Sequence, residues 1–187
     1  MSRTISDIIE RRSIRQYLEQ VVPHDVLELL IKAAKYAPSA MNAQIWHFTV
    51  ITNRGVIDRV TDTLKAASLH ESVPADFRTR VTKPEYTVNY GAPAFIIISG
   101  DPVWATAIND CSLAAGNIMI AAHSLGLGSC WINQPGAVCD VPQFRSLLTE
   151  LGVPQNYKVY ACVCIGYPAH SIAIPPDRID GVVNFVN

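Results

Sequence analysis

Residues 94–99 (Ala-Phe-Ile-Ile-Ile-Ser) form a continuous apolar run that follows Gly91 and Pro93 and ends at Gly100. A strand with one face in water alternates apolar and polar side chains, so a continuous run predicts a strand buried on both faces. Such a strand belongs in the middle of a sheet, and other layers must cover that sheet on both sides. The chain is therefore expected to fold in three layers.

The remaining pattern mixes helices with a few short strands. Alternating residues predict a strand over 46–51, and apolar segments bounded by turn residues predict strands over 129–133 and 157–166. Residues 16–20 are interpreted as a connection or a short edge strand. Spacing typical of helices covers 4–12, 23–36, 56–67, 104–125 and 141–151. Because helices and strands do not alternate regularly, we expect an α+β fold, a three-layer sandwich with one mixed sheet flanked by helices.

The predicted helix over 104–125 is apolar nearly all round, which indicates burial in a core or an interface. Its many alanines permit close approach, so we expect it to face the partner in a dimer. Its polar exceptions, Asp110, Asn117 and His123, are interpreted as satisfied core or interface groups rather than catalysts.

Composition favours one domain over residues 1–187 and a partner of the same kind. Apolar residues make up 49% and charged residues only 17%, which suggests that some apolar surface is covered in a homo-oligomer. The formal charge of −1 provides no electrostatic footprint for nucleic acid or an anionic membrane. Neither is expected as a partner.

The chain begins without the pattern of a signal or transit peptide, and it contains no apolar stretch of the roughly 18 residues that a membrane-spanning helix needs. A soluble, cytoplasmic protein is expected. The five cysteines are odd in number and lack CxxC spacing, which argues against a disulfide framework and a zinc site. We interpret them as buried structural thiols, with a redox or metal role as the alternative.

Arg11-Arg12-Ser13-Ile14-Arg15 concentrates three guanidinium groups and a hydroxyl at the end of the first predicted helix. Guanidiniums donate hydrogen bonds in planar, bidentate geometry, which suits a phosphate and the electron-rich edge of a heterocycle. The loop 37–44 adds short polar side chains and is anchored by the strand that follows it. The arginines alone also have a structural explanation, because cations near a helix C-terminus complement its macrodipole.

Several common site motifs are absent from the sequence. There is no GxGxxG after a strand, no P-loop, no GxSxG elbow and no HExxH spacing. Residues 68–90 are the least regular part and are interpreted as a flexible cover without chemistry of its own. An arginine-rich cradle without a nucleophile or a metal points to a phosphorylated organic cofactor that carries the chemistry itself.

Four stretches, taken together, resemble the FMN-dependent nitroreductase family. They are residues 11–15, residues 37–48, Gly91-Ala92-Pro93 and the helix from Asp110 to Leu125-Gly126-Leu127-Gly128, and they occur in the right order. The resemblance implies an intertwined homodimer of α+β subunits, with two FMN sites at the interface that are each built from both chains.

The resemblance also implies roles for single residues. Arg11, Arg12, Ser13 and Arg15 would bind FMN from one subunit, with Arg15 nearest the pyrimidine edge and the others toward the phosphate and ribityl chain. The other positions carried over are Pro38, Ser39, Ala40, Asn42 and Gln44 from the partner subunit, Trp131, Ile132 and Asn133 against the flavin ring near N5, and Arg178 at the phosphate.

The expected reaction passes hydride from NADH or NADPH through flavin N5 to a nitroaromatic, quinone or related acceptor by a ping-pong mechanism. Arg15 would act as an electrostatic catalyst, because reduction places negative charge on its side of the ring. Two alternatives remain open at this point. The same flavin scaffold could serve dehalogenation or heterocycle oxidation, or the protein could be a flavin-binding dimer without turnover.

Overall fold

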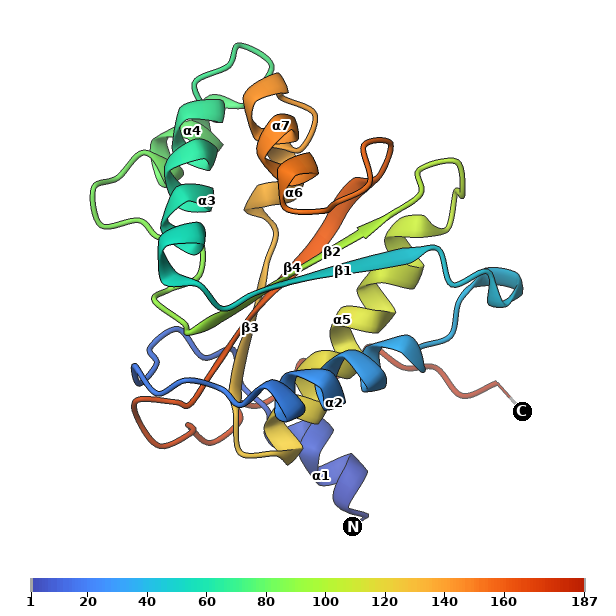
Figure 1. The fold of residues 1–187 in the computed structure, drawn as a ribbon. Coiled ribbons are helices and arrows are strands. Elements are labelled where there is room, and N and C mark those ends of the chain that lie inside the picture. The colour runs from blue at the N-terminus through green and yellow to red at the C-terminus, as the bar shows by residue number, and fades with distance from the viewer. Residues whose placement is uncertain (1, 187) are drawn as a thin grey trace.

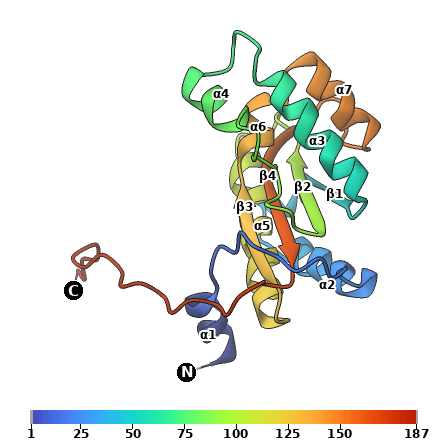
Figure 2. The same cartoon turned by 90° about the vertical axis from the view of Figure 1, so that its left-hand side faces the viewer.

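The computed structural model describes residues 2–186 and has one four-stranded sheet between two layers of helices (Figures 1 and 2). The strands are β1 (Trp46–Ile51), β2 (Ala94–Gly100), β3 (Gly128–Ile132) and β4 (Lys158–Gly166). Their order is β1-β2-β4-β3, so the apolar run of β2 lies inside the sheet as predicted. The expected α+β fold in three layers is confirmed.

Helices cover both faces of the sheet. One face carries α3 (Arg54–Ala67), α4 (Ala75–Val81), α6 (Gln134–Val138) and α7 (Pro142–Glu150). The other carries α1 (Arg3–Glu10), α2 (His24–Lys35) and the long α5 (Ala107–Ser124). Because side chains alternate along a strand, Phe95 and Ile97 enter the core under α3 and α7, while Ile96 and Ile98 enter the core under α2 and α5.

The four strands pair only antiparallel with one another. The parallel part of the expected mixed sheet is a single bridge between Ser13 and Ser129, at the start of β3. A second bridge, antiparallel, joins Tyr17 to Pro168 just after β4. Residues 16–20, which the sequence left open between a connection and an edge strand, therefore form a connection that is bridged at Tyr17 to the end of β4.

Residues 68–90 are more regular than the sequence pattern indicated. This segment contains α4, whose Phe77 and Val81 are buried in the core with Val73 and Val88. The apolar residues of α4 extend over only seven positions and are interspersed with polar residues, so the sequence pattern did not indicate a helix. The short helix α6 was also not predicted, because the Pro135-Gly136 pair indicates a turn.

All five cysteines are free and buried, as predicted. Asp110 and Asn117 are satisfied polar groups on α5, as expected; the Asn117 side chain donates to the Ala33 carbonyl of α2 at 3.0 Å. Within residues 2–186, none of the helices has the length and apolar character needed to cross a membrane.

The C-terminal tail after β4 reaches away from the body of the molecule, alongside α1 (Figure 2). Its apolar side chains are among the most exposed in the chain, with Phe185 and Val186 at 90% and 94% of full exposure. Three isoleucines of α1, Ile5, Ile8 and Ile9, are also about half exposed. These two segments leave an apolar surface that the described chain does not cover.

Candidate functional site

The arginine segment lies directly beside β3. Its Ile14 N–H donates to the Ser129 carbonyl at 2.9 Å, next to the Ser13–Ser129 bridge. Gly128 makes this approach possible, because a Cβ on that residue would lie 2.9 Å from three side-chain atoms of Ile14. The first predicted site segment is thereby fixed against the strand that carries another predicted group, Trp131, Ile132 and Asn133.

The far end of the segment is held by the residues that follow β4. The Leu18 N–H donates to the Tyr167 carbonyl at 2.9 Å, and the Ala169 N–H donates to the Gln16 carbonyl at 3.0 Å. The Tyr17 hydroxyl also donates to the Ile14 carbonyl at 2.6 Å, and burial raises the pKa of this phenol. The backbone that carries the arginines is therefore anchored on both sides.

An open hollow of about 340 Å³ lies over this anchored backbone. Its polar lining comes from the arginine segment and from two residues that the sequence did not single out, His170 and Ser171. The lining residues are Arg12, Ser13, Ile14, Arg15, Gln16, His170, Ser171 and Ala173. Nothing in the local sequence marks His170 and Ser171, because their position depends on pairing between the two ends of the chain.

The arginines differ in their surroundings. Arg12 donates from Nε to the Glu10 carbonyl at 3.1 Å and also to the Ile9 carbonyl, so it caps the last turn of α1 as the structural alternative proposed. Arg15 is exposed, and its guanidinium carbon lies 5.8 Å from the centre of the Tyr90 ring, in the turn before β2. The Arg15 charge is thus free of any helix terminus.

Cys130 of β3 lies beneath the arginine segment. Burial raises the pKa of its thiol, and the neighbouring Arg15 guanidinium opposes the shift, together with hydrogen bonds from Ser13 and Arg15. The thiol is therefore a neutral neighbour of the guanidinium and not a reactive thiolate. No group of three or more His, Cys, Asp or Glu side chains within residues 2–186 is arranged to hold a metal ion.

The second predicted segment forms a strained turn between α2 and β1. Residues 40–42 make a single 3₁₀ turn, and Met41, Asn42 and Gln44 have positive φ angles of 53°, 54° and 49°. The Gln44 N–H donates to Ser39 Oγ at 3.1 Å, and the Gln44 side chain donates to Asn42 Oδ1 at 3.2 Å. Non-glycine residues adopt this backbone only where the surroundings hold them.

The two predicted halves of the site do not meet within one chain. The arginine segment leads into the start of α2, whereas the turn at residues 40–42 follows its end (Figure 1). The 12 residues of α2 separate them by about 18 Å along the helix. Pro38, Ser39, Ala40, Asn42 and Gln44 thus form a group of their own.

The remaining predicted residues are divided. Trp131 is half-buried and Ile132 is buried on β3, while Asn133 is exposed at the start of α6. Arg178 lines a separate hollow of about 580 Å³ between α1 and the tail, with Ile8, Ile9 and Asp177. The structure therefore places the arginine segment beside Gly128, Ser129 and Cys130 of the strand that carries Trp131 and Ile132, and it leaves Arg178 at a separate hollow.

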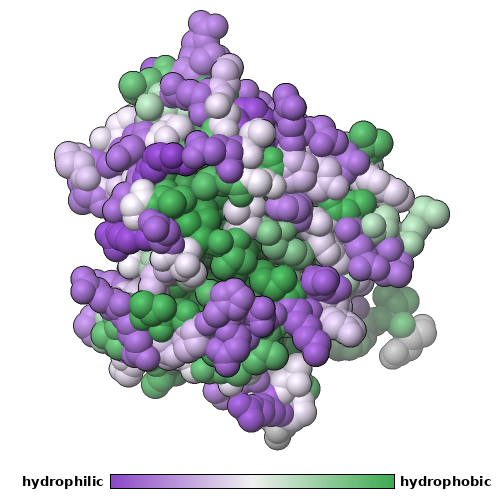
Figure 3. All heavy atoms as spheres, viewed as in Figure 1, coloured by the Kyte–Doolittle hydropathy of each residue, from purple (hydrophilic) through white to green (hydrophobic). Residues whose placement is uncertain are grey.

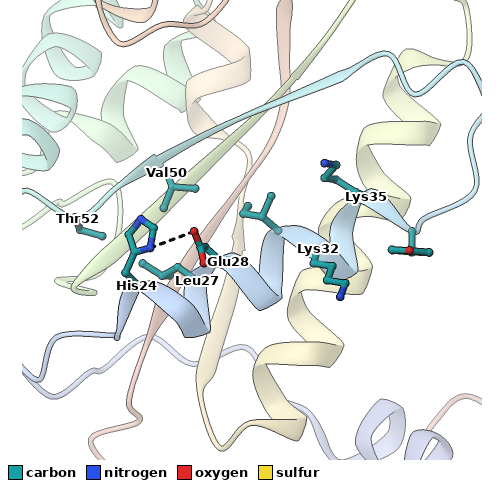
Figure 4. Close-up of a pocket in the computed structure, with 9 residues that line it drawn as sticks. His24, Leu27, Glu28, Lys32, Lys35, Val50 and Thr52 are labelled. Carbon is teal, nitrogen blue, oxygen red and sulfur yellow. Dashed lines mark ion pairs between the residues drawn. The ribbon is translucent and has the colours of Figure 1, made fainter.

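A larger hollow of about 690 Å³ lies between α2 and the edge strand β1, away from every predicted site residue. Figure 3 shows it as an apolar depression across this face, and Figure 4 shows Leu27 and Val50 facing each other across it. An exposed ion pair joins His24 Nδ1 to Glu28 Oε1 at 3.4 Å on its rim. The lining also carries Lys32 and Lys35, but it contains none of the residues that the sequence predicted for the cofactor.

Comparison with known proteins agrees with this geometry. Residues 8–167 match the model of the Nitroreductase family. A crystal structure of a nitroreductase with bound FMN from Bacteroides fragilis superimposes with a TM-score of 0.94 and 37% identity, covering 100% of both chains. A putative NADH dehydrogenase/NAD(P)H nitroreductase of Archaeoglobus fulgidus is 31% identical, over 90% of this chain and 87% of its own. An iodotyrosine deiodinase of Thermotoga neapolitana is 24% identical, over 85% of each chain.

Proposed function

Because this chain belongs to the nitroreductase family, we propose that it is an FMN-dependent oxidoreductase that carries electrons from NADH or NADPH to nitroaromatic, quinone or related acceptors. The observation that carries this proposal is the arginine segment anchored between β3 and the residues after β4, with a hollow above it. The family match covers the arginine segment, β3 and β4, and it ends at residue 167. The cytoplasm, where NADH and NADPH are supplied, is the proposed compartment.

The side chains at this hollow fit the proposed cofactor. Guanidinium and hydroxyl donors suit a phosphate and the carbonyl edge of a flavin, and Arg15, Ser13 and Gln16 are exposed. We propose that Arg11, Arg12 and Ser13 hold the phosphate and ribityl end and that Arg15 holds the pyrimidine end. Arg178 is a further candidate for binding the phosphate. For this contact, either the tail would have to move or the Arg178 of a second subunit would have to reach the site.

When bound, FMN supplies two-electron redox chemistry, with hydride uptake at N5 and release to an acceptor in a ping-pong cycle. Arg15 provides a fixed positive charge where that chemistry accumulates negative charge, which lowers the energy of the charged state. Trp131, Ile132 and Asn133 would line the ring from β3. This scheme needs no side chain to act as a catalytic acid.

We propose that the protein is a homodimer and that a second copy completes each site. The turn at residues 40–42 lies one helix length from the arginine segment of its own chain, so a neighbouring subunit must supply it to the flavin. The apolar hollow along β1, the exposed face of α1 and the apolar tail provide the surface for such a partner. β1 is also an edge strand, which is open to pairing on its outer side.

The proposal is tested by the absorption spectrum of the purified protein and by anaerobic addition of NADH and then NADPH. We expect a yellow protein that bleaches and that recovers when a nitro compound or a quinone is added. A protein that neither carries nor takes up FMN would overturn the proposal. Flavin that neither nicotinamide reduces would instead favour a binding protein without turnover.

Reductive dehalogenation is a second candidate, favoured by the likeness to an iodotyrosine deiodinase. The two reactions separate in one experiment on the reduced protein. Reoxidation by iodotyrosine with release of iodide, at a rate that exceeds reoxidation by nitro compounds and quinones, would favour dehalogenation. Reoxidation by nitro compounds and quinones without iodide release is the result expected from the leading proposal.

A further inference from the structure

Tyr90 adopts a backbone conformation that tyrosine rarely takes. Its φ angle is +54°, in the left-handed region, and Gly91 follows at +74°. A bulky residue pays a steric cost in this region, so it persists only where neighbouring contacts hold it there. The position has no local requirement for an aromatic side chain, because a glycine or asparagine would satisfy the turn more easily.

A compact hydrogen-bond network holds this turn in place. The Asn89 side chain is buried, with 2% exposure, and its Nδ2 donates to the Ala92 carbonyl at 2.6 Å. Its Oδ1 accepts from the Gly91 N–H at 3.2 Å. The Val88 N–H donates to the Thr61 hydroxyl of α3 at 3.2 Å. The turn is therefore fixed to α3 and to the residues just before β2, and the Cα–Cβ direction of Tyr90 is fixed with it.

The fixed ring lies against the guanidinium of Arg15. The guanidinium carbon is 5.8 Å from the ring centre, within the range of a cation–π contact. The Tyr90 side chain is only partly covered, at 39% exposure, so both partners remain accessible from the same side. The pKa of Arg15 is raised, mainly by Cys130, with a hydrogen bond to Tyr90 adding to the effect against partial burial.

We propose that Tyr90 is a positioning residue of the flavin site, which holds the Arg15 guanidinium in place for the pyrimidine edge of the cofactor. This inference rests on the proposed function. Arginine has a long, flexible stem, and a guanidinium that is already held loses less conformational freedom when it engages a ligand. The strained turn is held by α3 and by the residues before β2, and the Tyr90 ring in turn restricts the position of the Arg15 guanidinium.

The test compares Tyr90→Leu and Tyr90→Phe in three measurements: the FMN dissociation constant of the apoprotein, the midpoint potential of bound FMN and the thermal midpoint of the apoprotein. Leucine removes the aromatic face, so we expect FMN affinity to fall by about tenfold and the potential to become more negative. Phenylalanine keeps the face, so we expect affinity within about threefold of the parent protein.

A double-mutant cycle separates positioning from general stability. In an Arg15→Ala background, Tyr90→Leu should cause no further loss of FMN affinity, because the group that it positions is absent. Tyr86 is the matched control: its buried hydroxyl has no hydrogen-bond partner in the described chain, and the cation over its ring is Lys65, at 5.9 Å from the ring centre. Tyr86→Leu should lower the thermal midpoint without changing FMN affinity.

An equal loss of affinity with and without Arg15 would overturn the inference, as would an unchanged affinity and potential in Tyr90→Leu. These results differ from a failure of the proposed function. If the parent protein does not bind FMN, the function is wrong; if the parent binds FMN and Tyr90→Leu binds it equally well, only the role of Tyr90 is wrong.

Discussion

Asp110, in the first turn of α5, accepts the backbone N–H of Ala40 with both carboxylate oxygens, each at 3.3 Å. The carboxylate is buried, with 3% exposure, and it fixes the loop 37–44, which contains three left-handed non-glycine residues. Asp110 therefore joins α5 to the loop 37–44, which we expect to contact the flavin bound by the partner subunit.

Removing this carboxylate should loosen the turn. Asp110→Ala leaves the Ala40 N–H without its acceptor, and we expect a loss of about 1–3 kcal/mol in unfolding free energy with weaker FMN binding. Asp110→Asn retains one acceptor oxygen and should recover most of the affinity. Hydrogen exchange at Ala40 measures the loosening, and Asp62→Ala, which removes an exposed carboxylate from α3, controls for the lost charge. Unchanged exchange in Asp110→Ala would contradict this role.

Gly128 should tolerate no side chain. A Cβ there would meet Ile14 at 2.9 Å, so Gly128→Ala must push the arginine segment away from β3. We expect a loss of about 1–3 kcal/mol and reduced FMN affinity, because both the packing and the position of Arg15 change. Gly55→Ala on α3, whose new Cβ would make only an ordinary contact at 3.4 Å, should keep FMN affinity at the parent value. Equal FMN affinity in both variants would show that the segment adapts.

Shared sites predict complementation between subunits. Arg15→Ala and Asn42→Ala should each lower FMN binding, and each homodimer then carries the defect in both sites. In mixed dimers one site combines both intact halves, so unfolding and refolding the two variants together should restore about a quarter of the high-affinity sites, the yield of random pairing in a two-fold dimer. Recovery of no sites would place both residues in the same subunit's half of the site.

Alkaline pH should destabilise the fold through its buried thiols. Burial raises the pKa of all five cysteines above the ordinary 9.0, so the unfolded chain releases these protons at lower pH than the folded chain. Stability is then complete below about pH 9 and falls as the pH rises, by about 1.4 kcal/mol per pH unit for each such thiol. Urea unfolding at pH 8 and pH 10 measures this fall.

The fully buried Cys162 provides the comparison for that measurement. Cys162→Ala lowers stability at both pH values because it leaves a cavity, but it removes one titrating thiol and should make the fall between them smaller. An identical decrease in unfolding free energy between pH 8 and pH 10 in both proteins would mean that Cys162 does not contribute to the loss of stability at alkaline pH.

The parts of the fold that follow from local pattern were predictable. The strand at 46–51 was predicted with the bounds that the structure gives to β1, and the apolar run of β2 correctly indicated its central place. α4 was missed, because Pro74 and the charged residues around Phe77 and Val81 obscure a helix of only seven residues. Short helices depend on tertiary packing more than on their own spacing.

The candidate site was predictable in its ligand-like residues and not in the residues that place them. Arginine chemistry is visible in the sequence, but the contact of Tyr90 with Arg15 depends on a strained turn that no tyrosine signals. Likewise, Gly128 looks like an ordinary helix stop until Ile14 is found against it. That any of the predicted residues contacts FMN stays a prediction.

The anchoring of the arginine segment has a consequence for the order in which the protein assembles during translation. Ser13 emerges from the ribosome long before its partner Ser129, and Gln16 and Leu18 emerge before Ala169 and Tyr167, to which they are bonded. The arginine segment therefore cannot form these hydrogen bonds until nearly the whole chain has been synthesised. Contacts between such distant segments form slowly, so a nascent chain that stalls before Tyr167 should be unable to hold FMN.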